Sequence, residues 1–190
     1  FALQLLHNFK ILSIFIIKYL KKEKTLKFKS LLLILLFISN VFASNVDIKN
    51  LTPEQLETLK EIKKHGQDTG LSYTLMAIAI KESKLGEYMV NLDTKDFGLY
   101  QANIKTVLSR QNIKDTTWNR NVFASKLVSD FQFATKNAIE ELTFWQKIHR
   151  NDWTKVWGSY NAGYKFNSKQ AKEYSKEIAL IIKELKKFNV

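Results

Sequence analysis

The chain has 190 residues, of which 45% are hydrophobic and 13% aromatic, enough for one domain with a real core in addition to a leader. It contains no cysteine, which excludes disulfides, thiolate metal sites and a cysteine nucleophile. The formal net charge is +12, and residues 1–43, with seven lysines and one glutamate, carry half of it. The body is moderately basic without a run of five basic residues, which suits an anionic polymer or surface, and we expect no nucleic-acid partner.

Residues 26–45 have the three parts of an export signal. Two lysines precede an apolar run at residues 31–38, and Val-Phe-Ala at 41–43 gives a small-residue cleavage pattern. The run is shorter than the ~20 apolar residues that a transmembrane helix needs. We predict that residues 1–43 are a leader cut after Ala43, and that the protein is exported to the periplasm or cell envelope. The alternative is an uncut membrane anchor.

The leader itself divides into a signal peptide and an upstream extension. The two methionines of the chain lie at Met76 and Met89, so neither precedes the signal. We expect translation to begin at Leu26 through a non-standard start codon, with residues 1–25 as a reading-frame extension. Residues 44–190 are then the functional domain.

Two helices are predicted at the start of this domain. Thr52 as N-cap, Pro53 at the first helical position and Gln55 three residues after the cap predict a helix that ends at Gly66. Ser72 is the expected N-cap of a second helix, residues 73–84, whose body is almost wholly apolar. A helix that is apolar on all sides belongs in the centre of a fold.

The sequence after residue 86 predicts four further helices. Residues 86–101 mix glycine, asparagine and aspartate with aromatic residues, which is typical of a loop or short hairpin. The segment around Trp118 is expected to be a polar loop, from which its ring could stack on a sugar. Helices are predicted over Asn103–Arg110, from Asp130 with an apolar stripe to Ile148, over Trp153–Tyr160, and from Ser168 to a cationic end at Lys186 and Lys187. The fold class is therefore mainly α.

Glu82 is expected in the last turn of the central apolar helix. Partial burial disfavours the ionised form of a carboxyl group and raises its pKa, and a negative charge is unfavourable at a helix C-terminus. Both effects favour a proton donor near neutral pH. Position alone leaves the alternative open, because most glutamates in a last turn are solvated.

Three segments in order resemble the motifs of the lytic transglycosylase family, the soluble-transglycosylase (SLT) domain of the lysozyme-like superfamily. "ESKLG" at 82–86 resembles its glutamate-serine motif, "DFGLYQ" at 96–101 its glycine-leucine-x-glutamine motif, and "SYNAG" at 159–163 its tyrosine-asparagine-x-glycine motif. The resemblance runs from about Leu51 to the end of the chain and implies a mainly α, lysozyme-like (goose-type/SLT) fold with one irregular loop or short hairpin. The chain departs from the family at Tyr100, where methionine is usual, and at Ser159, where alanine is commoner. These departures leave the acid in place and bear on the shape of the glycan groove.

The resemblance implies a peptidoglycan lytic transglycosylase that cleaves the β-1,4 bond between N-acetylmuramic acid and N-acetylglucosamine. Glu82 would act as the single general acid and base, and the 6-hydroxyl of the muramic acid would close on C1 to give a 1,6-anhydro product. An intramolecular nucleophile is already positioned, with effective molarities of ~10⁵ to 10⁸ M. We expect no cofactor and no metal site. Expected partners are peptidoglycan glycan strands, the membrane if the leader stays uncut, and a possible cell-envelope assembly partner.

The resemblance also implies a set of substrate-binding residues around the acid. For two of these residues a structural role is an alternative to substrate binding. Ser83 could be a plain polar residue at a helix end, and Tyr174 could be a core residue. Two other functions stay open: a lysozyme-type hydrolase, in which Asp93 or Asp96 holds a water opposite Glu82, or a non-catalytic wall-binding or assembly protein on the same fold. The expected substrate-binding residues are Ser83, Tyr100, Gln101, Tyr160, Asn161 and Tyr174.

Overall fold

The computed structural model describes residues 48–188. All of them belong to the second of the two units into which the chain divides, Asn45–Val190. The predicted leader, its cleavage site and the expected start at Leu26 lie outside the described residues. Within the part that the structure describes, no helix combines the length and the apolar character needed to cross a bilayer.

Helices dominate the described residues, which confirms the predicted fold class. Two short 3₁₀ turns accompany them, η1 at Ile48–Asn50 and η2 at Gly163–Lys165. The α-helices are α3 (Pro53–Gly66), α4 (Ser72–Ser83), α5 (Ile104–Arg110), α6 (Thr117–Ser129), α7 (Phe131–His149), α8 (Trp153–Ala162) and α9 (Lys169–Leu185).

A small antiparallel sheet occupies the segment predicted as a loop or short hairpin. Its strands β1 (Val90–Asn91), β2 (Asp96–Phe97) and β3 (Ala102–Asn103) lie in the order β1-β2-β3. In the register, Phe97 of β2 stands opposite Val90 on one side and opposite Ala102 on the other. The hairpin prediction is therefore confirmed, with a third strand added.

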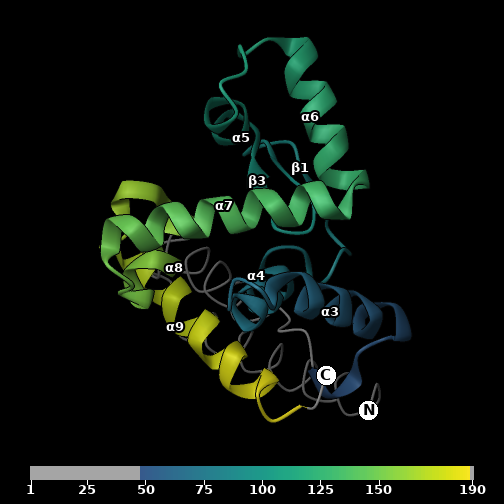
Figure 1. Ribbon diagram of the computed structural model, residues 1–190, viewed down its shortest axis with the longest axis vertical. Helices are drawn as coiled ribbons and strands as arrows, with labels where there is room; N and C mark the ends of the chain where they lie inside the picture. The colour runs from purple at the N-terminus through teal and green to yellow at the C-terminus, as the bar shows by residue number, and fades with distance from the viewer. Residues whose placement is uncertain (1–47, 189–190) are drawn as a thin grey trace, which may run out of the picture. The chain divides into compact units, whose positions relative to one another are not determined.

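The helix that carries Glu82 lies in the main core, as its apolar sequence predicts. Every residue of α4 from Thr74 to Ile80 is buried, and the helix packs against α3, α7 and α9. A second, smaller core lies between α5 and α6 and is built on Ile104, Val107, Leu108 and Leu127. In Figure 1, α7 runs between the α5–α6 group on one side and α3, α4 and α9 on the other. The two cores therefore lie on opposite sides of one long helix.

Several helix ends follow the predicted capping chemistry. Thr52 and Gln55 form a reciprocal capping box at the start of α3. The side chains of Asp130 and Ser168 accept hydrogen bonds from the first turns of α7 and α9. These local signals placed the beginnings of three of the helices.

The prediction for Ser72 was wrong. Ser72 is the first residue of α4 rather than its cap, and Leu71 precedes the helix without a capping side chain. The Ser72 hydroxyl instead donates to the Lys63 carbonyl oxygen at 2.7 Å. That carbonyl lies in the last turn of α3, where the main-chain acceptors lack helical partners, so Ser72 satisfies the end of the preceding helix.

The loop predicted around Trp118 is also wrong, because the segment forms α6. Thr116 caps the helix by accepting from the Asn119 N–H at 3.1 Å. Along α6 only Leu127 is fully buried, so the apolar periodicity that identifies a helix from sequence is weak here. Trp118 lies in the first turn of α6 and is 76% exposed.

Candidate active site

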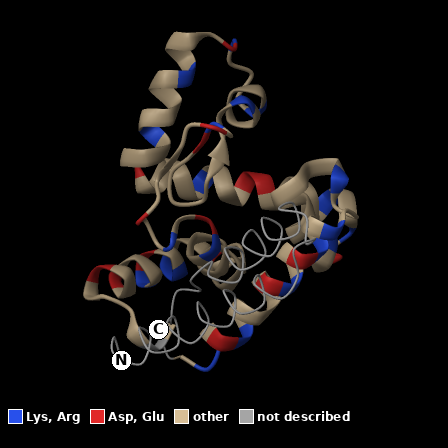
Figure 2. Ribbon diagram, turned by 180° about the vertical axis from the view of Figure 1, so that it is seen from behind, with Lys and Arg blue, Asp and Glu red and all other residues tan. Residues whose placement is uncertain are grey.

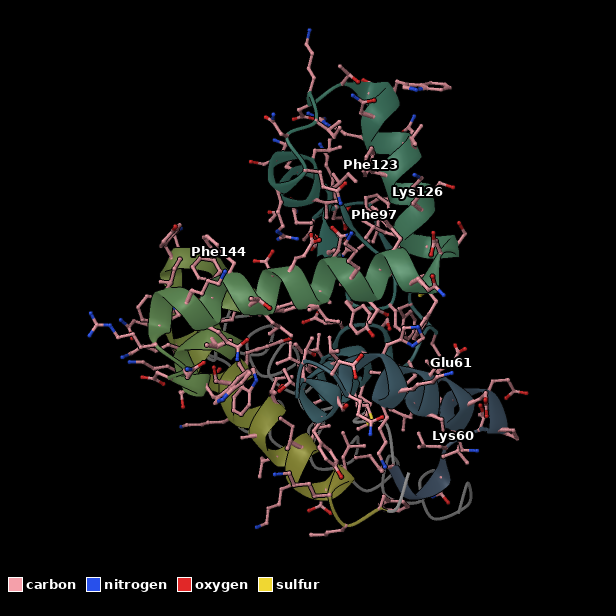
Figure 3. All side chains as sticks on the ribbon, viewed as in Figure 1. Lys60, Glu61, Phe97, Phe123, Lys126 and Phe144 are labelled. Carbon is pink, nitrogen blue, oxygen red and sulfur yellow. The ribbon has the colours of Figure 1, made fainter. Side chains whose placement is uncertain are left out.

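A cleft of about 830 Å³ runs beside α7 and collects residues from six elements or their ends: α4, the sheet, α5, α7, α8 and η2. Figure 3 shows the side chains on this frame. Of the predicted site residues, Glu82, Gln101, Tyr160 and Asn161 line the cleft together. Three segments that lie far apart in the sequence therefore meet at one site.

Glu82 stands in the last turn of α4 at the wall of this cleft. Its Oε1 accepts a hydrogen bond of 2.6 Å from the Tyr174 hydroxyl. Burial raises the pKa of Glu82 from its ordinary value of 4.5 to about 7, against the opposing effects of the Tyr174 hydrogen bond and the charge of Lys81. The negative charge of Asp96 adds a smaller upward contribution to the pKa. A carboxyl group with this pKa can both give and take a proton near neutral pH.

Tyr174 combines the two roles considered for it from the sequence. Its side chain is buried in the main core, and its hydroxyl reaches Glu82. Burial first, and then the nearby charge of Glu82, keep the pKa of Tyr174 well above its usual range, so the hydroxyl stays a hydrogen-bond donor. Tyr174 therefore acts on the cleft through Glu82 and does not itself line it.

We expect Tyr174→Phe to raise the pKa of Glu82 above about 7, because the lost hydrogen bond stabilises the ionised carboxylate. An NMR titration that follows the Glu82 side-chain carboxyl carbon measures this change. Tyr73→Phe, on the same helix as Glu82, is the matched control and should leave the titration where it is. An unchanged or lowered pKa in Tyr174→Phe would contradict the assignment.

Ser83 does not face the cleft, in contrast to its expected contact with substrate. Its side chain is fully buried, and its hydroxyl donates to the Leu99 carbonyl oxygen at 2.7 Å. The Ser83 hydroxyl oxygen also accepts a hydrogen bond from the Gly86 N–H at 3.0 Å. Ser83 thus ties the end of α4, next to Glu82, to the segment that carries the second motif.

Ser83→Ala is expected to lower the free energy of unfolding by about 1–3 kcal/mol, because it leaves the buried Leu99 carbonyl without this donor. Urea unfolding at constant pH measures the loss. Ser129→Ala provides the control, since the Ser129 hydroxyl is exposed and bonds only to its own helix, and we expect a change within about 0.5 kcal/mol. Equal small effects in both variants would show that Ser83 does not hold this junction.

Tyr100 is likewise buried, so its side chain cannot supply the expected contact with substrate. It is 1% exposed, and its hydroxyl pairs with the Thr135 hydroxyl on α7 at 3.2 Å. The main-chain carbonyl of Tyr100 accepts a hydrogen bond of 2.9 Å from the Tyr160 hydroxyl. This bond connects the second motif to the third and places the Tyr160 ring in the cleft lining.

Gln101, next to Tyr100, and Asn161, next to Tyr160, both line the cleft. Gln101 has a positive φ of 46°, and its amide nitrogen donates to the carbonyl oxygens of Tyr88 and Gly98 at 3.0 and 2.9 Å. The side chain therefore braces the hairpin while it lines the cleft. Asn161, in the last turn of α8, is exposed there.

The two aspartates considered for a second catalytic carboxylate are placed differently. Asp96 lines the cleft and accepts a hydrogen bond of 2.8 Å from the Asn103 amide. Asp93 is exposed in the turn of the hairpin, where its N–H donates to the Asn91 side chain at 3.2 Å. Asp93 therefore lies in a turn that the Asn91 side chain closes, and Asp96 alone of the two belongs to the site.

The cleft contains charged and aromatic residues that the sequence analysis did not select. Arg110 of α5 forms an ion pair with Glu141 of α7, and Glu141 also accepts from the Trp145 indole N–H at 2.6 Å. Phe144 and Tyr164 complete this part of the lining. A spacing of four residues between Glu141 and Trp145 was a readable signal of their contact, whereas the pairing with Arg110 depends on the tertiary fold.

The charges of the cleft do not have a single sign. Glu82, Asp96 and Glu141 line it together with Lys105 and Arg110. Figure 2 shows basic and acidic residues interspersed along the helices in the same manner. Within residues 48–188, no three acidic or histidine side chains gather in a way that could hold a metal ion.

Comparison with known proteins agrees with this geometry. Residues 60–182, which include all three motifs and the cleft, match the family described as "Transglycosylase SLT domain". The chain is also 29% identical over 147 residues to the "Uncharacterized 20.7 kDa protein in vs-regB intergenic region" of Enterobacteria phage T4, an alignment that covers 74% of this chain and 77% of the phage protein. No solved structure matches significantly. The chain belongs to the transglycosylase SLT domain family, a lysozyme-like family whose transglycosylase-type activity cleaves the glycan of peptidoglycan.

Proposed function

We propose that this protein is a peptidoglycan lytic transglycosylase that cleaves the β-1,4 bond between N-acetylmuramic acid and N-acetylglucosamine and forms a 1,6-anhydro-muramic acid end. The observation that carries the proposal is Glu82, a carboxyl group with a pKa near 7 at the wall of a large cleft. Membership of the family supplies the substrate class. The products released from purified peptidoglycan test it, because a transglycosylase and a hydrolase leave different sugar ends.

The reaction needs one carboxyl group in two protonation states. Protonated Glu82 gives its proton to the glycosidic oxygen as the bond to C1 breaks, so the leaving sugar departs with a free hydroxyl. Ionised Glu82 then takes the proton from the 6-hydroxyl of the muramic acid, whose oxygen bonds to C1. The proton balance closes on Glu82, and a pKa near 7 suits both steps because neither protonation state is costly near neutral pH.

The hydrogen bond from Tyr174 selects which oxygen of Glu82 moves the proton. Because the Tyr174 hydroxyl donates to Oε1, Oε1 acts as the carbonyl oxygen of the protonated acid and Oε2 carries the proton. Tyr174 is thus a positioning residue for Glu82. We assign the contacts with the sugar and its N-acetyl group to Gln101, Tyr160 and Asn161, which share the cleft with Glu82.

A hydrolase of the lysozyme type is the second candidate function, and the position of Asp96 favours it. Such an enzyme needs a second carboxylate, ~5 to 9.5 Å from the acid depending on its stereochemistry, to act as nucleophile or to activate a water. Asp96 lines the same cleft, and its charge raises the pKa of Glu82. Its side chain also has a structural use, because it holds the Asn103 amide.

Asp96→Asn separates the two functions. For the transglycosylase we expect most of the cleavage to remain and the pKa of Glu82 to fall, because the variant removes a neighbouring negative charge while keeping an oxygen for Asn103. Turnover of purified sacculi across a pH series measures both. Loss of cleavage at every pH would instead assign Asp96 the second catalytic role.

We also propose that the protein acts after export, in the periplasm or cell envelope. The charge and apolar pattern of residues 26–45 motivates this location, and it is where the glycan substrate lies. N-terminal sequencing of the protein from an envelope fraction should find Ser44 as the first residue. A mature chain that begins upstream of residue 26 would contradict the cleavage.

A further inference from the structure

The outer face of α9 carries three lysines whose charge no ion pair neutralises. Lys172, Lys176 and Lys183 are exposed, and none of them pairs with a carboxylate of the described residues. At the pitch of an α-helix their side chains leave α9 within an arc of about 40° and along a length of about 16 Å. They form a row of positive charge, the lysine ridge.

The acidic side chains of α9 do not cancel the charge of the lysine ridge. They leave the helix about 100° away from it, and each pairs with another lysine. The pairs are Glu173 with Lys169, Glu177 with Lys81 of α4, and Glu184 with Lys187. The charge of the ridge is therefore available to a partner outside the chain.

An exposed leucine lies beside the lysine ridge. Leu180 is 63% exposed and follows Lys176 one turn later, about 40° further round the helix. It takes no part in the apolar stripe that α9 buries against the core, which consists of Ala171, Tyr174, Ile178 and Leu185. The outer face of α9 thus offers one large apolar side chain among basic groups.

This combination fits an anionic bilayer better than a protein or a soluble polyanion. Lysine is depleted in protein–protein interfaces, whereas each basic residue near an anionic lipid surface strengthens binding about fivefold. A soluble polyanion would use the lysines but not Leu180. A bilayer uses both, because lysine ammonium groups stay at the phosphates while an apolar side chain enters the boundary with the acyl chains.

The lysine ridge is separate from the cleft. Helix α9 contributes no residue to the described lining of the cleft. In Figure 1, α9 lies on the side of α7 away from α5 and α6. A surface that binds the outer face of α9 therefore does not take the place of a ligand in the cleft.

We propose that the lysine ridge and Leu180 dock the protein on a membrane that contains anionic lipid. The lysines contact the lipid phosphates, and Leu180 enters the boundary between headgroups and acyl chains. This site does not depend on the reaction at Glu82. Because the ridge is exposed, its attraction to the membrane weakens as the ionic strength rises.

A dye attached to α9 tests this contact directly. The chain has no cysteine, so Ala179→Cys, at an exposed position next to Leu180, gives a single site for an environment-sensitive nitrobenzoxadiazole dye. The labelled full chain is mixed with vesicles of equal parts phosphatidylglycerol and phosphatidylcholine. We expect the emission to shift to the blue and to be quenched by nitroxide-labelled lipid. Vesicles of phosphatidylcholine alone should give neither effect.

Charge variants of the labelled chain show whether the lysine ridge causes the response. Lys172→Gln/Lys176→Gln/Lys183→Gln should abolish it, because three losses of about fivefold each weaken docking on the order of a hundredfold. The matched control removes the same charge from exposed positions on α3 and α7 and should keep the response. It is Lys64→Gln/Lys136→Gln/Lys147→Gln. Both variants should cleave sacculi, which contain no membrane, at the wild-type rate.

A second label position separates docking through α9 from lipid binding by residues 1–43. Asn121→Cys places the dye on an exposed position of α6, where it should stay in water. An equal response at this position would overturn the proposal, and so would a response at position 179 that is absent or that persists without the ridge lysines. If those lysines are required to bind polyphosphate while the dye at 179 stays in water on vesicles, the ridge binds a soluble polyanion and the proposal falls.

Discussion

Glu82→Gln is expected to slow the release of glycan fragments by about 10²- to 10⁴-fold, the range for loss of a general acid or base. In the proposed reaction one carboxyl performs both tasks, so the upper end of the range applies. The wild-type rate should also fall as the pH rises through about 7, because the proton that the first step requires is then lost from Glu82. Initial rates on sacculi from pH 5 to pH 9 measure both effects.

The stability of the same variant shows whether its inactivity has another cause. In the native wild type the pKa of Glu82 is about 7, against 4.5 in the unfolded chain. The stability linked to this group is therefore complete below pH 4.5 and is lost as the pH rises through 7, since the native state must then bury an ionised carboxylate. Glutamine does not titrate. Relative to wild type, Glu82→Gln should gain melting temperature between pH 5 and pH 8.

A melting-temperature difference that does not depend on pH would contradict this account of Glu82. It would show that the carboxyl is as well solvated in the native protein as in the unfolded chain. Loss of activity in Glu82→Gln with a large loss of stability at both pH values would assign the inactivity to unfolding. The proposed chemistry requires inactivity together with a folded variant that is relatively more stable at pH 8.

Gly98→Ala is expected to lower the free energy of unfolding by about 3 kcal/mol or more. Gly98 has a φ of +81°, which L side chains rarely adopt, and a Cβ at this position would overlap the Leu127 carbonyl oxygen and lie 2.8 Å from its carbonyl carbon. These atoms belong to the backbone of α6 and cannot turn away as a side chain can. The hairpin must separate from α6, at a cost above that of ordinary overpacking. Urea unfolding measures the change.

Gly163→Ala is the matched control for this prediction. Gly163 also has a positive φ, +57°, but no atom lies within 4 Å of its would-be Cβ. We expect a loss of about 1–3 kcal/mol from the backbone alone, because a φ of 57° with a ψ of −132° is a sparsely populated conformation for residues with a Cβ. If Gly98→Ala were no more costly than Gly163→Ala, the close approach of the hairpin to α6 would not be a determinant of stability.

The sequence predicted the helices wherever two independent signals coincided. A capping side chain preceded a clear apolar stripe at Thr52, Asp130 and Ser168, and helices begin at each of these positions. No such stripe follows Thr116, which caps α6 in the structure, because α6 packs through few residues around Leu127. Ser72 failed for a different reason, since its hydroxyl serves the end of α3 and not the start of its own helix.

The site was predictable to the extent that local sequence determines it. The last turn of an apolar helix placed Glu82 in partly buried surroundings, and the raised pKa follows from that position. Successive helical residues point about 100° apart, so Ser83 is buried while Glu82 faces the cleft, although both belong to one motif. The contact between Arg110 and Glu141, and the meeting of Phe144 with Tyr164 around Trp145, join segments far apart in the chain. These contacts cannot be predicted from the spacing of residues in the sequence.

The central claim is that one carboxyl, Glu82, drives an intramolecular closure on C1. Mass spectrometry of the muropeptides released from purified sacculi tests it most directly, with Glu82→Gln run in parallel. We predict products that end in 1,6-anhydro-muramic acid for the wild type and none for the variant. Products with ordinary reducing ends would contradict the claim and assign water activation to Asp96, and release that persists in Glu82→Gln would remove Glu82 from the reaction.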